Sequence, residues 1–400
     1  MSENKLLTGI LIVLTVSVLA TGGAVAYIAL GQAQEGVEAQ APSAEQALQD
    51  SLQAGSEAAQ TDTTPAGPRI VYANEQDGDD SLYIIDVDNE STDRQKISSP
   101  DVGYCFFPAW SPDGQRVAYS GAAVRPFETD EDVPVEVWVS TADGSEHVRV
   151  SPAISDTAFF RARSTWSPDG ELLAFIVQQR ARTNNSATIH IVRSDGSGTE
   201  REIAFPRHIE QLTWSPTKDE LLIVSGNPRN SDTMIVHTMS TNGSEITEVF
   251  QGAVTADWLP GGESIVVGDF TVPEILVIDL NQDGQNESTR SIAQTVLQPV
   301  EIAWSPSGDH VAVAANGHYR QGYSTVMYVA TVESGEIATV AEGDGWVGWP
   351  SWSADGQRLT FTRGALRAAR ANLWVYDATT GQLDQLTTDD NFQGAGVWSP

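Results

Sequence analysis

Residues 110–114 read Trp110-Ser111-Pro112-Asp113-Gly114, and partial copies of this phrase recur along the rest of the 400-residue chain. Successive copies are 44 to 56 residues apart and begin at Trp166, Trp214, Trp258, Trp304, Trp352 and Trp398. A period of this size is typical of propeller blades and related repeat units. The repeat therefore governs how the residues between its copies are interpreted.

Each copy predicts a tight turn between two β-strands. Proline presets the backbone angle of the second turn position, and glycine relieves strain at the exit. A large aromatic residue precedes the turn, and an apolar run such as Leu172-Leu173-Ala174-Phe175 follows it. A third apolar run, a second turn such as Asp143-Gly144 and a weaker fourth run complete the unit. Four short antiparallel strands per repeat predict a propeller blade.

The two ends of the repeat region predict a closed ring. The run Arg69-Ile70-Val71-Tyr72 resembles a second strand that lacks a first strand, whereas Val397-Trp398-Ser399-Pro400 resembles a first strand with no blade after it. Pairing them completes one blade and removes free sheet edges. The expected fold is all-β: a seven-bladed β-propeller of four-stranded antiparallel blades at residues 69–400, closed by the C-terminal strand joining the first blade and preceded by one transmembrane helix.

The residues before the propeller predict an anchor and a tether. Residues 6–30 carry no charge and are long enough to span a bilayer as a helix. Lys5 precedes this span and acidic residues follow it, so residues 1–5 are expected in the cytoplasm and the propeller outside, at the cell membrane. A signal peptide cleaved near Ala24-Val25-Ala26 is the alternative. Residues 31–68 have almost no large apolar side chains and are expected to be a disordered tether.

The excess of acidic residues limits the kinds of partner that the protein can bind. Asp and Glu number 54 against 22 Lys and Arg, a formal charge of −32. Such a surface repels nucleic acid, because binding a polyanion needs clustered cations. It suits an extracellular domain and equally a salt-adapted organism, and composition does not choose between them. The single cysteine, Cys105, can form no intrachain disulfide and is expected to be a packed thiol.

The repeat also has a family resemblance. Residues 109–119, with Trp138 in the third strand and Asp143-Gly144 after it, resemble the TolB-type repeat of TolB, of tricorn-type proteases and of dipeptidyl-peptidase-IV-like propellers. The likeness covers about residues 69–400 and fades at Trp258. TolB has six blades and an additional N-terminal domain, so its partnership with a peptidoglycan-associated lipoprotein does not carry over.

The resemblance raises the question of catalysis. Peptidases of this group add a catalytic domain with a Gly-x-Ser-x-Gly elbow, a motif that this sequence lacks. A similar seven-bladed oligogalacturonate lyase holds a metal with histidines, whereas only His208 and His318 map to the expected channel face here. We therefore expect a protein that is not an enzyme, with a polysaccharide-acting lyase or hydrolase as the alternative.

One segment resembles a calcium loop. It places oxygen ligands at loop positions 1, 3, 5 and 9, which are Asp279, Asn281, Asp283 and Glu287. Arg290 stands where an EF-hand has its final glutamate, and the same residues also read as an ordinary turn between the third and fourth strands. No cofactor is expected, with calcium at these four residues as the alternative.

Aligning the repeats on their tryptophans predicts a binding site. Positions six and three before each tryptophan enter the innermost strand and should ring the mouth of the central channel. The expected ligand-binding residues are Tyr104, Phe107, Phe160, Arg163, His208, Gln211, Glu301, Trp346, Trp349 and Phe392. Loops on the same face carry eleven arginines: Arg125, Arg161, Arg163, Arg180, Arg182, Arg207, Arg229, Arg320, Arg363, Arg367 and Arg370.

The alternative is that these aromatic residues only pack between blades and that the arginines are scattered, solvated charges. The predicted function is a membrane-anchored, extracytoplasmic and monomeric propeller that binds an envelope protein, peptide or glycan without catalysis.

Overall fold

The computed structural model describes residues 67–400 except 77–78, 89–93, 124–133, 152–157, 161–162, 180–185, 228–232, 317–324, 344, 366–369 and 389–390. The expected membrane span, and all but the last two residues of the expected tether, lie outside the described residues. Within the described part, no helix is long and apolar enough to cross a membrane. Of the chain's two units, the following concerns Gly67–Pro400.

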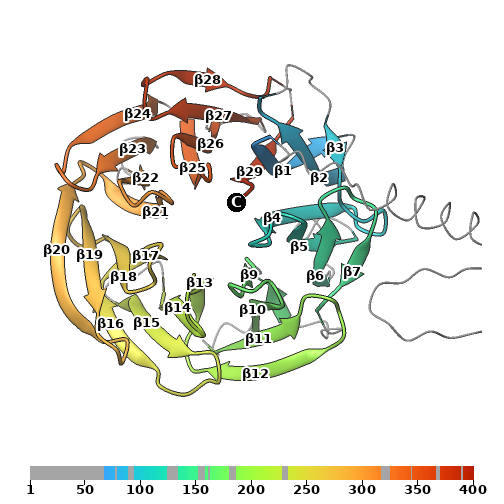
Figure 1. Ribbon diagram of the computed structural model, residues 1–400, viewed down its shortest axis with the longest axis horizontal. Coiled ribbons are helices and arrows are strands. Elements are labelled where there is room, and N and C mark those ends of the chain that lie inside the picture. Colours follow the sequence, from blue (N-terminus) through green and yellow to red (C-terminus); the bar gives the residue numbers. More distant parts are fainter. Residues whose placement is uncertain are drawn as a thin grey trace, which may run out of the picture. The chain divides into compact units, whose positions relative to one another are not determined.

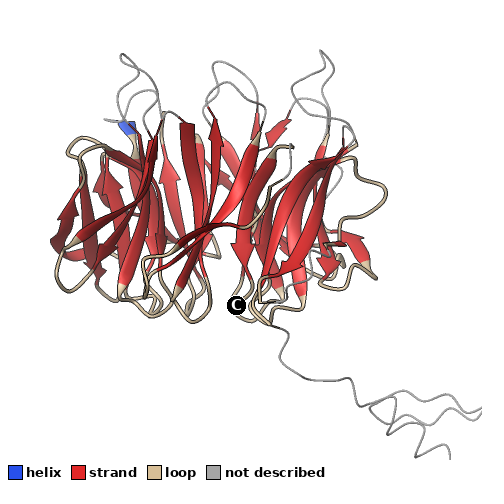
Figure 2. Ribbon diagram, turned by 90° about the horizontal axis from the view of Figure 1, so that it is seen from above, coloured by secondary structure: helices blue, strands red, loops and turns tan. Residues whose placement is uncertain are grey.

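The described residues of this unit are all-β, and their sheets stand radially around a common centre (Figure 1). The strands run between two faces that carry the loops (Figure 2). We call the face with the turns after the repeated tryptophans the turn face, and the opposite face, where the innermost strands begin, the mouth face. The chain end at Pro400 lies at the turn face (Figure 2).

The first sheet has eight strands in the order β29-β1-β2-β4-β5-β6-β7, with β3 beside β2. A single parallel pair, Asp80 with Tyr104, joins its two halves, so each half is a blade of four antiparallel strands. The strands are β1 (Arg69–Gln76), β2 (Asp79–Asp86), β3 (Gln95–Lys96), β4 (Tyr104–Trp110), β5 (Arg116–Ala122), β6 (Val135–Thr141), β7 (His147–Arg149) and β29 (Gln393–Trp398).

In the next sheet the expected innermost strand is split in two, because β8 and β9 pair separately with β10. This sheet contains β8 (Ala158–Phe160), β9 (Thr165–Trp166), β10 (Leu172–Gln179), β11 (Ala187–Arg193) and β12 (Thr199–Phe205).

Four further sheets have four antiparallel strands each, in sequence order from the centre outward. Two contain β13 (Ile209–Trp214), β14 (Glu220–Ser225), β15 (Ile235–Ser240) and β16 (Thr247–Gln251), then β17 (Ala253–Trp258), β18 (Ser264–Asp269), β19 (Glu274–Leu280) and β20 (Asn286–Gln294). The last two contain β21 (Gln298–Trp304), β22 (His310–Asn316), β23 (Thr325–Thr331) and β24 (Ile337–Gly343), then β25 (Gly345–Trp352), β26 (Arg358–Ala365), β27 (Ala371–Asp377) and β28 (Leu383–Gln385).

The repeated phrase forms the predicted turn. The Gly114 N–H donates to the Ser111 carbonyl oxygen at 2.9 Å, and Gly114 has a φ of 65°. The Ser111 hydroxyl donates to Asp113 at 2.5 Å and accepts from the Arg116 N–H at 2.9 Å. These bonds satisfy the polar groups of the reversal within residues 111–116, which explains why the same residue types recur.

The expected pairing of the chain's two ends is present. Strand β29 pairs with β1 in antiparallel register, with Trp398 opposite Ile70 and Val397 opposite Val71. The Ser399 N–H donates to the Arg69 carbonyl oxygen at 2.8 Å. The N-terminal blade therefore takes its innermost strand from the other end of the repeat region.

The apolar cores lie between neighbouring blades. One cluster, for example, joins Val266 and Val277 of one blade to Trp304 and Val313 of the next. Because each blade buries both faces against its neighbours, its strands read as continuous apolar runs. Cys105 is buried in such a core as expected, and burial raises the pKa of its thiol to about 12.

Two kinds of hydrogen bond join the repeated tryptophans to the preceding blade. In the first kind the indole N–H donates to a main-chain carbonyl, and these tryptophans are Trp110, Trp166, Trp258 and Trp352. In the second kind the main-chain N–H of a repeated tryptophan donates to a side-chain oxygen in the preceding blade. The acceptor is the residue just before that blade's own repeated tryptophan. The pairs are Trp214 with Thr165, Trp304 with Asp257 and Trp398 with Ser351.

Candidate functional site at the channel mouth

The innermost strands are irregular close to the mouth face. Strand β4 shifts register between Phe106 and Ala109, and β25 shifts between Gly348 and Ser351. At these shifts Phe107 and Trp349 have φ values of 55° and 56°. Bulky residues rarely adopt a positive φ, and both precede a proline, which further disfavours helical backbone angles. Such strain persists only where the surrounding structure enforces it, and it is concentrated at functional sites.

An ion pair reaches across the centre of the ring. Arg163 precedes β9 and Glu301 lies in β21, and two complete blades, β13–β16 and β17–β20, separate them along the shorter way round (Figure 1). The Arg163 Nη2 lies 3.6 Å from the Glu301 Oε1. The Arg163 guanidinium also lies 5.2 Å from the centre of the Phe107 ring, within range of a cation–π interaction.

Glu301 is fixed from the other side by a strained residue. Its Oε2 accepts a hydrogen bond of 2.5 Å from the Trp349 N–H. The carboxylate therefore connects the backbone of Trp349 to the guanidinium of Arg163. Half of the Arg163 side chain and 29% of the Glu301 side chain remain exposed, so both charged groups are accessible at the mouth.

Three aromatic rings stand beside this pair. Trp346 and Trp349 meet edge to face with centroids 5.0 Å apart, and Phe392 stacks on Trp346 at 6.1 Å. All three side chains are partly exposed. Gly364 makes room for this cluster, because a Cβ atom there would lie 2.5 Å from the Trp346 Nε1.

The structure thus brings together six of the ten predicted residues, namely Phe107, Arg163, Glu301, Trp346, Trp349 and Phe392. We call these six residues the mouth cluster. It combines apolar ring faces, one cation and one anion, which is a composition suited to binding an amphipathic ligand.

The other four predicted residues have different surroundings. Gln211 joins two blades, since its Nε2 donates to the Ala256 carbonyl oxygen at 2.6 Å. His208 lies 2.8 Å from Glu210, and Tyr104 packs partly buried against the core between two blades. Phe160 lies in β8, but its side chain is outside the described part.

The arginines of the mouth face are described only in part. Arg163, Arg207, Arg363 and Arg370 fall within the described residues, and the other seven predicted arginines lie outside them. Arg207 donates to the Thr233 carbonyl oxygen and Arg363 to that of Glu342. Arg207 therefore fastens a loop and Arg363 reaches strand β24 of the neighbouring blade, whereas Arg163 points to a carboxylate of a distant blade.

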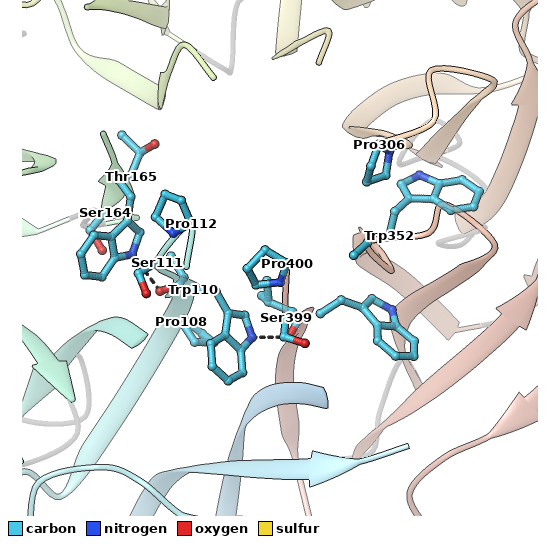
Figure 3. A pocket seen from close by; sticks show the side chains of 15 residues that line it. Pro108, Trp110, Ser111, Pro112, Ser164, Thr165, Pro306, Trp352, Ser399 and Pro400 are labelled. Carbon is cyan, nitrogen blue, oxygen red and sulfur yellow. Dashed lines mark hydrogen bonds between the residues drawn. The ribbon is translucent and has the colours of Figure 1, made fainter. Parts of the chain in front are cut away.

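A cavity of about 400 Å³ lies at the other end of the innermost strands (Figure 3). Its walls are mainly tryptophans and prolines of the repeated phrase, such as Trp110, Trp352, Pro112 and Pro400. None of the ten predicted binding residues lines it. The indole N–H of Trp110 and of Trp352 is bonded to a neighbouring blade. These groups are already used in joining blades, so we place the candidate site at the mouth.

Asp257 is an acidic residue near the channel that sequence reasoning missed. It immediately precedes Trp258, and its carboxylate accepts from the main-chain N–H groups of Trp258 and Trp304. Burial raises the pKa of Asp257 to about 6. The available signal was that Asp257 occupies the position of Thr165 and Ser351 in the repeat alignment.

The expected calcium segment is a turn between β19 and β20. The Asn281 Oδ1 accepts from the main-chain N–H groups of Asp283 and Gln285, and Asp279 accepts from Ser264 and Ser288. Among the described residues, no group of three or more His, Cys, Asp or Glu side chains is placed to bind a metal.

Comparison with known proteins gives two partial family matches and one curated relative. The model described as "Dipeptidyl peptidase IV (DPP IV) N-terminal region" matches residues 302–398, and that described as "Eukaryotic translation initiation factor eIF2A" matches residues 158–329. The "Uncharacterized peptidase YuxL" of Bacillus subtilis (strain 168) is 26% identical over 202 residues. That match covers 49% of this chain and only 28% of the relative's length.

Many solved structures are similar in fold, and two of them illustrate the likeness. An oligogalacturonate lyase in complex with manganese has a TM-score of 0.57 at 13% identity, covering 77% of this chain and 85% of that chain. Prolyl endopeptidase gives 0.54 at 15% identity, covering 80% and 50%. At these identities the likeness establishes the fold alone. The protein is a β-propeller, and the predicted resemblance to TolB-like and dipeptidyl-peptidase-IV-like propellers is confirmed.

The prediction that the protein is not an enzyme is wrong. A curated relative is named as a peptidase, and the model of a peptidase region matches the last repeats of this chain. Both findings point toward an enzymatic role. The prediction failed because it rested on two absences, that of a Gly-x-Ser-x-Gly elbow and that of a third histidine on the expected channel face. These absences argue only against one type of catalytic domain within these residues and against a three-histidine metal site.

Proposed function

We propose that this protein is a seven-bladed, membrane-anchored propeller that binds peptide chains at the mouth cluster, as the substrate-binding module of a peptidase-type activity outside the cytoplasm. The observation that carries the proposal is the network from Phe107 through Arg163 and Glu301 to Trp349. It holds two strained aromatic residues and an ion pair across one opening.

The chemistry of this network fits a peptide. Its aromatic faces can receive apolar side chains, while Glu301 can accept from a peptide N–H and Arg163 can donate to a peptide oxygen. Rigid aromatic and arginine side chains dominate binding energies at interfaces. The peptidase name of the relative and the matching peptidase region favour peptide over glycan.

The test uses the full chain in detergent and two ligand panels, short peptides of varied sequence and acidic oligosaccharides. Binding is followed by tryptophan fluorescence and calorimetry, and peptide cleavage by mass spectrometry. We expect peptides to bind, and Trp346→Ala to weaken binding at least tenfold together with any cleavage. The control is Arg149→Ala, since Arg149 is 47% exposed and paired with Glu136 on an outer strand. Binding of oligosaccharides alone, or unchanged binding by Trp346→Ala, contradicts the proposal.

The membrane anchor is tested separately. The uncharged run at residues 6–30 supports a span, and the presence of Lys5 before it with no Lys or Arg after it until Arg69 supports an outward-facing propeller. Protease added to intact cells should cut within residues 31–66 and leave a small membrane-bound stub. A protected full-length protein contradicts the orientation, and the absence of a stub shows that the span is a cleaved signal.

A further inference from the structure

The ion pair of the mouth cluster is longer than a direct charge-assisted hydrogen bond. Arg163 meets Glu301 at 3.6 Å, whereas charge-assisted hydrogen bonds between such groups are about 2.7–2.9 Å long. The outer pair Arg149 and Glu136 has nearly the same exposure but a separation of 2.7 Å. The Arg163 guanidinium therefore keeps donor capacity that Glu301 does not use.

The orientation of Arg163 is nevertheless set. Its guanidinium lies over the Phe107 ring, and Phe107 is itself held at a positive φ. A cation–π contact with a ring face uses none of the guanidinium N–H donors, and the planar fork of these donors matches a carboxylate in bidentate geometry. A ligand carboxylate can thus form shorter contacts with Arg163 than Glu301 does.

Glu301 does not follow Arg163, because the Trp349 N–H holds its other oxygen. When a ligand engages Arg163, the Glu301 Oε1 is left as an acceptor next to the new carboxylate. Two adjacent carboxylates repel, so a purely anionic ligand is disfavoured. A ligand that presents a carboxylate together with a neighbouring N–H donor satisfies both groups.

The last residue of a peptide has this arrangement, with a free carboxylate and an amide N–H on the same Cα. Its side chain would meet the ring faces of Trp346, Trp349 and Phe392, which are partly exposed beside Glu301. On the basis of the proposed function, we infer that the mouth cluster binds the free carboxyl termini of peptides with an apolar last residue. Arg163 receives the carboxylate and Glu301 receives the terminal amide N–H.

The experiment compares three forms of one peptide with an apolar last residue: free at both ends, amidated at the carboxyl end, and acetylated at the amino end. Calorimetry with the full chain should show at least tenfold weaker binding after amidation and unchanged binding after acetylation. Arg163→Gln should abolish the preference for the free carboxylate, and Arg149→Gln should retain it. Because the comparison of peptide forms needs no variant, a folding defect in Arg163→Gln does not obscure the outcome.

Each contrary result has a distinct meaning. Equal binding of the free and amidated forms overturns the recognition of carboxyl termini but is consistent with peptide binding. Weaker binding after acetylation instead assigns the site to amino termini, with Glu301 as the partner of the ammonium group. Failure of all three forms to bind contradicts the proposed function itself.

Discussion

The indole N–H of Trp110 donates to the carbonyl oxygen of Val397 at 3.0 Å, although 287 residues separate them. This bond joins the second blade along the chain to the strand that completes the first. Trp398 joins the same strand to the last blade on the other side, because the Arg358 guanidinium of β26 lies 5.0 Å from the centre of its ring.

Deletion of residues 395–400 should therefore destabilise the whole propeller. It removes the partners of Ile70, Val71 and Tyr72 in β1 and exposes two apolar faces. Loss of a single buried tryptophan side chain already costs about 3–5 kcal/mol, so we expect at least that loss in free energy of unfolding. Thermal melting measures it, with deletion of residues 31–60 as the control. Equal melting temperatures for the two truncations would refute closure by β29.

Replacement of Arg116 by lysine should cost about 1–2 kcal/mol in free energy of unfolding. The Arg116 guanidinium lies 5.0 Å from the centre of the Trp166 ring and donates to the Gly170 carbonyl oxygen and the Ser194 hydroxyl. Lysine keeps the charge but not the planar fork. Urea unfolding provides the measurement, and Arg149→Lys on an exposed strand should change stability by less than about 0.5 kcal/mol. Equal effects of both substitutions would show that Arg116 contributes only its charge.

At position 349 a glycine variant should be more stable than an alanine variant, which is the reverse of the usual order. Trp349 has a φ of 56°, which costs alanine strain that glycine avoids. We expect Trp349→Gly to be about 1 kcal/mol more stable than Trp349→Ala, while both lose peptide binding. Chemical denaturation compares the two variants. The same pair at Trp346, whose φ is not positive, is the control and should favour alanine. A more stable alanine variant at position 349 would show that the strand relaxes.

Asp257 should make stability depend on pH. Burial raises its pKa from 3.8 to about 6, so between these values the folded state holds a proton that the unfolded state has released. Stability should accordingly fall as pH rises from 4 to 7, by about 2–3 kcal/mol for this group. Asp257→Thr keeps an acceptor for the Trp304 N–H, as Thr165 does for Trp214, but cannot titrate.

Chemical denaturation of Asp257→Thr and the wild-type protein at pH 4 and pH 7.5 gives the test. Relative to the wild-type protein, the free energy of unfolding of the variant should rise by about 2–3 kcal/mol from pH 4 to pH 7.5. A constant difference in free energy would show that the Asp257 carboxyl is as well solvated in the folded protein as in the unfolded chain.

Much of the fold could be predicted because its determinants are local. The turn at Ser111 to Gly114 satisfies its own polar groups, and the apolar runs that follow need only a neighbouring blade against which to pack. The orphan strands at Arg69 and Trp398 likewise predicted their pairing. By contrast, splitting of the expected innermost strand before Trp166 into β8 and β9 was not foreseen, because the register of pairing depends on loop geometry rather than on the apolar pattern.

The sequence by itself determined the repeat, the turns and the ring of positions at the mouth, because residues at equal spacing from each tryptophan must lie at equal height in their blades. It also drew attention to Phe107 and Trp349 through their shared place three residues before a repeated tryptophan. Only the tertiary structure decided that Arg163 meets Glu301, since that contact depends on which blades face each other across a closed ring. The strain at Trp349 and the raised pKa of Asp257 are likewise tertiary effects, because neighbouring blades impose the backbone angle and exclude the water.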